Sequence, residues 1–100
     1  MENISFKPEP RKYGSTIEKI YNEGKVPHTH QKLLDAFKMG LAPDTKGELC
    51  LQKVIDYLHI TRWRAHVISR FLVKYGYIKY EADHYKHCIH VEILKGGDSN

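Results

Sequence analysis

Apolar residues recur every three or four positions in successive stretches of the first 75 residues, the spacing of one face of an α-helix. The first stretch is short. Ser15 and Glu18 have the spacing of a capping box, in which each residue satisfies a backbone N–H of the other. Gly24 provides a C-terminal stop, because glycine adopts the left-handed conformation without strain. The apolar face of this predicted helix consists of Ile17, Ile20 and Tyr21.

The second stretch predicts a helix that Thr29 caps, that reaches Met39 and that Gly40 ends. Its apolar stripe consists of Leu33, Leu34, Phe37 and Leu41. A turn-rich segment over residues 43–47 follows, and residues 48–50 fit either a very short strand or a turn that leads into the next helix.

Two further helices are predicted close together. The first stops near His59 and has an apolar stripe of Leu51, Val54, Ile55 and Leu58. Ile60 is expected to fill the space between the helices, and Thr61 is placed to cap the second one. That helix covers residues 62–75 and ends before Gly76. Its inward face is predicted to consist of Ala65, Ile68, Leu72 and Tyr75, and its outward and flanking positions of Arg62, Trp63, His66, Ser69, Arg70 and Lys74.

After Gly76 the period changes to two, which is typical of β-strands with one buried face. The alternating apolar positions are Ile78, Tyr80 and Ala82, then Ile89, Val91 and Ile93. The sequence therefore predicts an α+β fold with three to four helices followed by a two-stranded β-hairpin. Residues 15–94 would form this domain, with a flexible basic arm over 1–14 and a flexible tail over 95–100.

The composition of the chain bears on its number of domains, on the charge of its partner and on its location. One hundred residues fit a single small domain, and a net charge of +4 with a pI near 9.1 fits a polyanionic partner. No apolar run approaches the roughly 20 residues of a membrane span, and no secretory signal follows Met1. Cys50 and Cys88 lie in apolar surroundings without a CxxC motif, which predicts buried thiols in a reducing compartment. We expect a cytoplasmic, nucleoid-associated protein, or one that is otherwise intracellular.

An apolar helix, a short turn and a second helix that ends in Leu72-Val73-Lys74-Tyr75-Gly76-Tyr77-Ile78 follow one another in this chain. This pattern resembles the winged helix-turn-helix family of DNA-binding domains. The resemblance covers residues 29–94. It implies a winged-helix fold in which residues 77–94 form the wing, and it implies binding of double-stranded DNA by a small transcriptional regulator. The helix 62–75 would enter the major groove.

On that basis we expect the DNA-binding residues to be Arg62, Trp63, Arg64, His66, Arg70, Lys74, Lys79 and Lys86. Arginine and histidine side chains would contact bases or nearby phosphates, Trp63 a sugar or a thymine methyl, and the wing lysines the phosphate backbone. The basic arm, with Lys7, Arg11 and Lys12, is better explained as a solvated tail than as a groove-tracking segment. The alternative to DNA contact is that helix 62–75 has an ordinary solvated basic face, with Trp63 folded onto the core.

Two departures from the family keep a second function open. Val67 and Val73 are aliphatic where many relatives carry polar or charged residues, which favours a protein–protein interaction module. A third reading is an accessory factor that acts on RNA or in a replication complex. Recognition of paired half-sites would call for a homodimer, and the interface would come from Tyr13, Ile17, Ile20 and Tyr21.

Histidines and a cysteine near the end of the chain are candidate metal ligands. His84, His87, Cys88 and His90 crowd one strand, but their spacing matches no zinc motif, so surface or core histidines explain them more simply. The chain has no P-loop, GxSxG or HExxH motif. We therefore expect no metal, no cofactor and no enzymatic activity.

Overall fold

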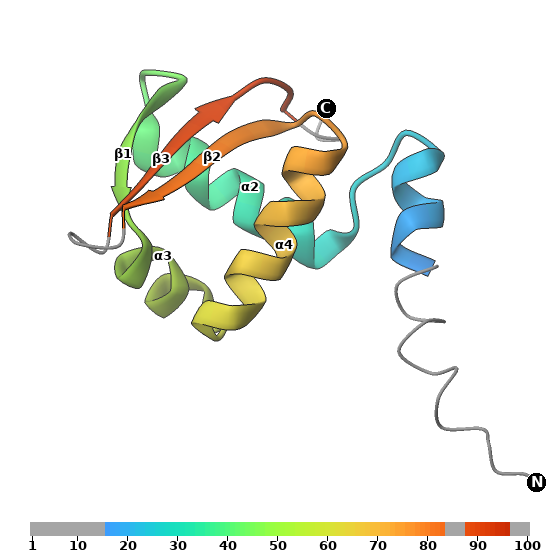
Figure 1. Ribbon diagram of the computed structural model, residues 1–100, viewed down its shortest axis with the longest axis horizontal. Helices are drawn as coiled ribbons and strands as arrows, with labels where there is room; N and C mark the ends of the chain where they lie inside the picture. The colour runs from blue at the N-terminus through green and yellow to red at the C-terminus, as the bar shows by residue number, and fades with distance from the viewer. Residues whose placement is uncertain (1–15, 84–87, 97–100) are drawn as a thin grey trace, which may run out of the picture.

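The computed structural model describes residues 16–83 and 88–96. Residues 16–22 are helical, and the remaining elements follow in the order α2 (His28–Leu41), β1 (Lys46–Cys50), α3 (Leu51–Leu58), α4 (Arg62–Lys74), β2 (Ile78–Asp83) and β3 (Cys88–Ile93) (Figure 1). The described residues thus contain four helices and three strands, which confirms the predicted α+β class. The arrangement is compatible with a winged helix-turn-helix.

The strands form one antiparallel sheet in the order β1-β3-β2. The predicted hairpin is confirmed as β2 and β3, with Tyr80 opposite Val91 at its centre. The hairpin is not two-stranded on its own, however, because β1 pairs along the other edge of β3. The segment 48–50, for which the sequence left a strand or a turn open, is therefore the second half of a strand.

Both predicted ends of the second helix are wrong. The N-cap of α2 is Pro27, with no side-chain hydrogen bond, and Thr29 lies inside the first turn. Gly40 lies within the last turn and does not end the helix, which continues to Leu41. The glycine instead leaves room for a side chain of β1. A Cβ at Gly40 would lie 2.8 Å from Cδ2 of Leu49, so the missing side chain makes room for β1.

The core lies between the helices and one face of the sheet. From α2 it takes Leu33, Leu34 and Phe37, from α4 Ala65, Ile68 and Leu72, and from the sheet Ile78, Ile89 and Val91, all at most 2% exposed. Burying one such aliphatic or aromatic side chain contributes about 1.5–3 kcal/mol. The predicted alternation is confirmed for β3, where Ile89 and Val91 are buried and Ile93 partly so, and for the start of β2, where Ile78 is buried and Tyr80 partly buried. Ala82, also expected on the buried face, is exposed at the far end of β2.

An aromatic cluster fixes helical residues 16–22 against the C-terminal half of α4. The ring of Tyr21 stacks on that of Tyr75 at a centroid distance of 4.5 Å and an interplanar angle of 1°, and Phe71 lies 5.9 Å away. Tyr21 is 4% exposed and Ile17 is 5% exposed. These two residues were expected at a dimer interface, but the chain buries them in its own core.

His30 of α2 belongs to the same aromatic cluster, where its ring packs against Tyr21 and Phe71. It is 2% exposed, and its Nδ1 forms a hydrogen bond of 2.7 Å with the hydroxyl of Tyr21. Burial, with a smaller effect of the positive charge of Arg64, lowers the pKa of His30 to about 4. Burial also raises the pKa of Tyr21, so both groups are neutral at pH 7 and the cluster holds no buried charge.

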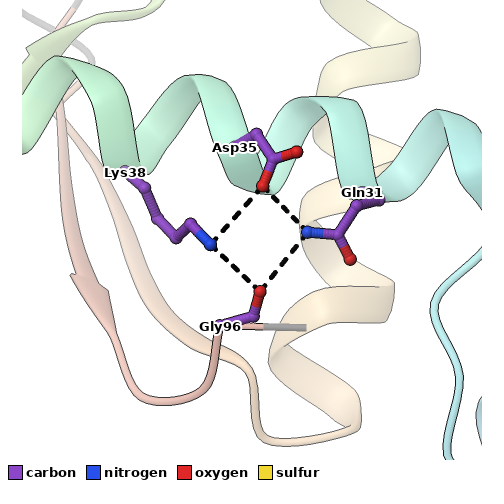
Figure 2. Close-up of polar contacts among 4 residues, drawn as sticks. All are labelled: Gln31, Asp35, Lys38 and Gly96. Atoms are coloured by element: carbon purple, nitrogen blue, oxygen red, sulfur yellow. Dashed lines mark hydrogen bonds and ion pairs between the residues drawn. The ribbon is translucent and has the colours of Figure 1, made fainter. Parts of the chain in front are cut away.

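The end of the described chain is attached to α2. The carbonyl of Gly96 accepts hydrogen bonds from Lys38 Nζ (3.1 Å) and Gln31 Nε2 (3.3 Å). Asp35 Oδ1 accepts from the same Gln31 nitrogen at 2.9 Å and lies 3.5 Å from Lys38 Nζ (Figure 2). The start of the segment predicted as a tail therefore contacts the helix beside it.

We expect the stability of the domain to fall as the pH is lowered from 7 toward 4. The pKa of His30 is about 4 in the folded chain and about 6.5 in an unfolded one. Between these values the unfolded chain binds more protons, so the free energy of unfolding rises with pH there. The loss on going to pH 4 should be on the order of 1–3 kcal/mol.

Urea unfolding at a series of pH values measures this effect. His30→Gln should flatten the profile between pH 4 and 6.5, whereas His28→Gln, at an exposed position two residues away, should leave its slope unchanged. An identical slope in wild type and in His30→Gln would show that His30 is not the responsible group.

Candidate nucleic-acid interface

A tight turn joins α3 to α4 and fixes how α4 is presented. His59 ends α3 in the left-handed conformation, with φ 58° and ψ 44°. The N–H of Ile60 then donates to the carbonyl of Ile55 at 3.2 Å. Thr61 caps α4 as predicted, because its Oγ1 accepts from the N–H of Arg64 at 3.1 Å.

The buried side of α4 is wider than the sequence predicted. Ala65, Ile68 and Leu72 point inward, but Ser69, expected on the outer side, is also buried at 1% exposure. Ser69 follows Ile68 by about 100° around the helix. That sector faces β2, which packs against α4 and covers it. Tyr75, expected inward, is only partly buried and stacks on Tyr21.

Two candidate residues stand on the face of α4 opposite the core. Trp63 is 73% exposed and Arg70 is exposed, and seven residues of helix place them on one side about 10 Å apart. The side chain of Arg70 has no hydrogen bond, ion pair or ring contact with any residue that the structure describes. Trp63 is not folded onto the core, and within residues 16–83 and 88–96 no group occupies the donors of the Arg70 guanidinium.

The other two arginines of α4, Arg62 and Arg64, pack against neighbouring helices. Arg62 Nη2 donates to Gln52 Oε1 at 2.6 Å, and Gln52 Nε2 donates to Asp56 Oδ1 at 2.8 Å. This network, on the side of α4 next to α3, orients the Arg62 guanidinium at the start of α4. Arg64 is half-buried on the opposite flank, where it lines a small hollow with Thr29 and Lys32 of α2.

His66 connects α4 to the sheet. Its Nδ1 forms a hydrogen bond of 3.1 Å with the hydroxyl of Tyr80 on β2, and the two rings meet edge to face at 85°. Burial raises the pKa of Tyr80, so this phenol stays protonated at neutral pH. The half-buried position of His66 gives it a part in holding β2 against α4.

The candidate lysines lie in three places. Lys74 is on the outer side of α4, and its Nζ lies 3.4 Å from Glu18 Oε2. Lys79 is on the solvent face of the sheet, 72% exposed and 4.0 Å from Glu92 Oε1. An open groove of about 770 Å³ includes Lys79 and Val73, so α4 and the solvent face of β2 share a border. Lys86 lies outside the described residues.

The structure therefore brings Trp63, Arg70 and Lys74 to the exposed side of α4. Arg62 is half-buried beside Gln52 of α3, and Arg64, His66 and Lys79 lie away from that exposed side. Sequence reasoning missed the partners of these groups. Gln52 and Asp56 have an i, i+4 spacing that could have indicated their contact, but nothing in the sequence links them to Arg62. Glu18 is 56 positions from Lys74 and carries no such signal, whereas Glu92 is the cross-strand partner of Lys79 in the hairpin that the sequence predicted.

Comparison of the chain with protein-family models, with curated proteins and with solved structures finds no match. Within residues 16–83 and 88–96, no three His, Cys, Asp or Glu side chains gather so that they could hold a metal ion. None of the helices in the same ranges has the length and apolar character needed to cross a membrane. The exposed side chains of α4 are therefore the main evidence on function.

The cap of α4 gives a direct test of how the helix begins. Thr61→Ala should destabilise the domain by about 1 kcal/mol, because the N–H of Arg64 loses its acceptor. Thr29→Ala removes the same hydroxyl from an exposed position that caps nothing, so its free energy of unfolding should stay the same or rise slightly. Urea unfolding compares the two variants. Equal losses would show that Thr61 does not act as a cap.

Proposed function

We propose that this domain binds double-stranded DNA by inserting the exposed face of α4 into the major groove, as a small transcriptional regulator does. The observation that carries the proposal is the pairing of Trp63 and Arg70 on one accessible face of the second helix of a helix-turn-helix. An α-helix with its side chains is about 10–12 Å wide and the major groove is about 12 Å wide, so one face of α4 fits against the base edges.

Each accessible residue has a chemical role in this arrangement. Arg70, with all its donors available, suits bidentate hydrogen bonding to guanine. Trp63 presents a flat apolar surface for a thymine methyl or a deoxyribose. Arg62, oriented by Gln52 at the start of α4, and Lys74, at the other end of the helix, would contact phosphates on the strands that flank the groove. Lys74 would exchange Glu18 for a phosphate.

We expect Arg70→Ala to weaken binding to the preferred duplex by about 1–3 kcal/mol if Arg70 contacts a base. Selection from a random duplex library supplies that duplex, and fluorescence anisotropy measures the affinity. Lys25→Ala is the matched control, because it removes one positive charge from an exposed position between helical residues 16–22 and α2, outside α4 and outside the groove that Lys79 lines. Equal affinities for the two folded variants would contradict this docking.

A protein partner is the second candidate, and one observation favours it. Trp63 and Val73 are both exposed large apolar residues on α4, at 73% and 44%. Salt separates the two functions. DNA binding should weaken steeply as salt rises, with each lost phosphate contact lowering the log–log slope by about 1, whereas an apolar protein contact should hardly respond.

Trp63 also reports directly on the interface, because it is the only tryptophan of the chain. At 73% exposure its fluorescence should be quenched readily by acrylamide in the isolated protein. Saturating duplex should protect it, since a base or sugar then covers the indole. Duplex binding that leaves the quenching of Trp63 unchanged would place the DNA on another surface.

A further inference from the structure

Two cysteines face each other on the solvent side of the sheet. Cys50 of β1 is the direct partner of Cys88 of β3 in the antiparallel register. Both are partly exposed, and neither is in a disulfide bond. Cys50 is also the N-cap of α3, so the pair lies where the sheet meets the helix-turn-helix. The two residues are 38 positions apart in sequence, and only the pairing of β1 with β3 brings them together.

The hydrogen bonds of the ladder define what kind of pair this is. The N–H of Ile93 donates to the carbonyl of Thr45 at 2.7 Å, and the register places these two residues opposite each other. Hydrogen-bonded and non-hydrogen-bonded pairs alternate along an antiparallel ladder. Counting from this hydrogen-bonded pair, the non-hydrogen-bonded pairs are Lys46–Glu92, Glu48–His90 and Cys50–Cys88.

Non-hydrogen-bonded pairs have the geometry that a disulfide needs. Their Cα atoms are about 4.5 Å apart and their side chains lie closer than in the other pairs. A disulfide requires Cα atoms separated by about 4.4–6.8 Å. The neighbouring pair of the same row shows that side chains meet across it, since His90 Nε2 lies 3.6 Å from Glu48 Oε2. The two thiols are thus in place to join without a change in register.

We infer that Cys50 and Cys88 form a redox-modification site, at which a low-molecular-weight disulfide such as oxidised glutathione converts the two thiols into one cross-strand disulfide. One cysteine thiolate attacks a sulfur of the oxidant, which forms a mixed disulfide and releases one small thiol. The second cysteine thiolate then attacks the protein sulfur of that mixed disulfide and releases the second small thiol. The protein loses two hydrogens and the oxidant gains them.

Folding and oxidation favour each other at this site. A bond between these positions closes a loop of roughly 40 residues, which restricts the unfolded chain far more than the folded one. By the thermodynamic cycle that links folding with oxidation, the disulfide should form about 10²–10³ times more favourably in the folded chain than in the unfolded chain. This inference does not depend on the proposed function, because it concerns β1 and β3 and not the exposed face of α4.

The test is an equilibrium titration of the whole chain with mixtures of reduced and oxidised glutathione, in buffer and in urea, read by intact mass after acid quenching. In buffer the wild type should lose the mass of two hydrogen atoms, and peptide mapping should link Cys50 to Cys88. The oxidation constant should exceed that in urea by about 100-fold or more. Cys50→Ser and Cys88→Ser are the matched controls, and each should stop at a single glutathione adduct.

Three results would overturn the inference: adducts on both cysteines of the folded wild type, disulfide-linked dimers as the main product, or oxidation constants that differ by less than about tenfold between buffer and urea. None of these results bears on DNA affinity. Failure of this site and failure of DNA binding are therefore separate observations.

Discussion

The burial of one side of α4 is the constraint on which the other elements depend. Ala65, Ile68 and Leu72 are at most 2% exposed, with α2 on one flank and β2 on the other. Truncating one of these larger aliphatic side chains typically costs about 2–5 kcal/mol, a large part of the stability of a domain this small. Because the inner side of α4 is fixed so firmly, the direction in which its outer side faces is fixed as well.

The outer side of α4 carries some side chains that contact other parts of the domain and others that have no such contact among the described residues. Arg62 is oriented by Gln52 and Lys74 lies near Glu18, while Trp63 and Arg70 have no partner among the described residues. Exposed ion pairs contribute little to stability, so the contact between Lys74 and Glu18 is easily exchanged for a phosphate. The available tryptophan and arginine lie between two basic groups whose positions are already set.

The local elements could be predicted from the sequence because each has a local cause. The spacing of Ala65, Ile68 and Leu72, the Thr61 cap and the change of period after Gly76 gave α4 and the hairpin. Features that depend on distant contacts could not be predicted. Gly40 looked like a helix stop, but it is there because Leu49 packs over it. Ser69 looked exposed because nothing in the sequence shows that β2 covers that side of α4.

The same distinction applies to the candidate site. The helical wheel correctly placed Trp63, Arg70 and Lys74 on the outer side, because that depends only on the period of the helix. It could not show that Arg64 faces α2 or that His66 meets Tyr80, since both depend on how elements pack together. That DNA is the partner, and that these residues contact it, stays a prediction.

The addition of β1 changes how the hairpin relates to α4. A hairpin joined to the domain only through β2 would pivot at Tyr77, but β3 is the central strand and is paired on both edges. On its other side β1 leads directly into α3, and Leu49 packs over Gly40 of α2. The sheet is thus attached to three helices. The relative position of Lys79 and the outer side of α4 is therefore set by the core, so any partner that contacts both must match a fixed spacing.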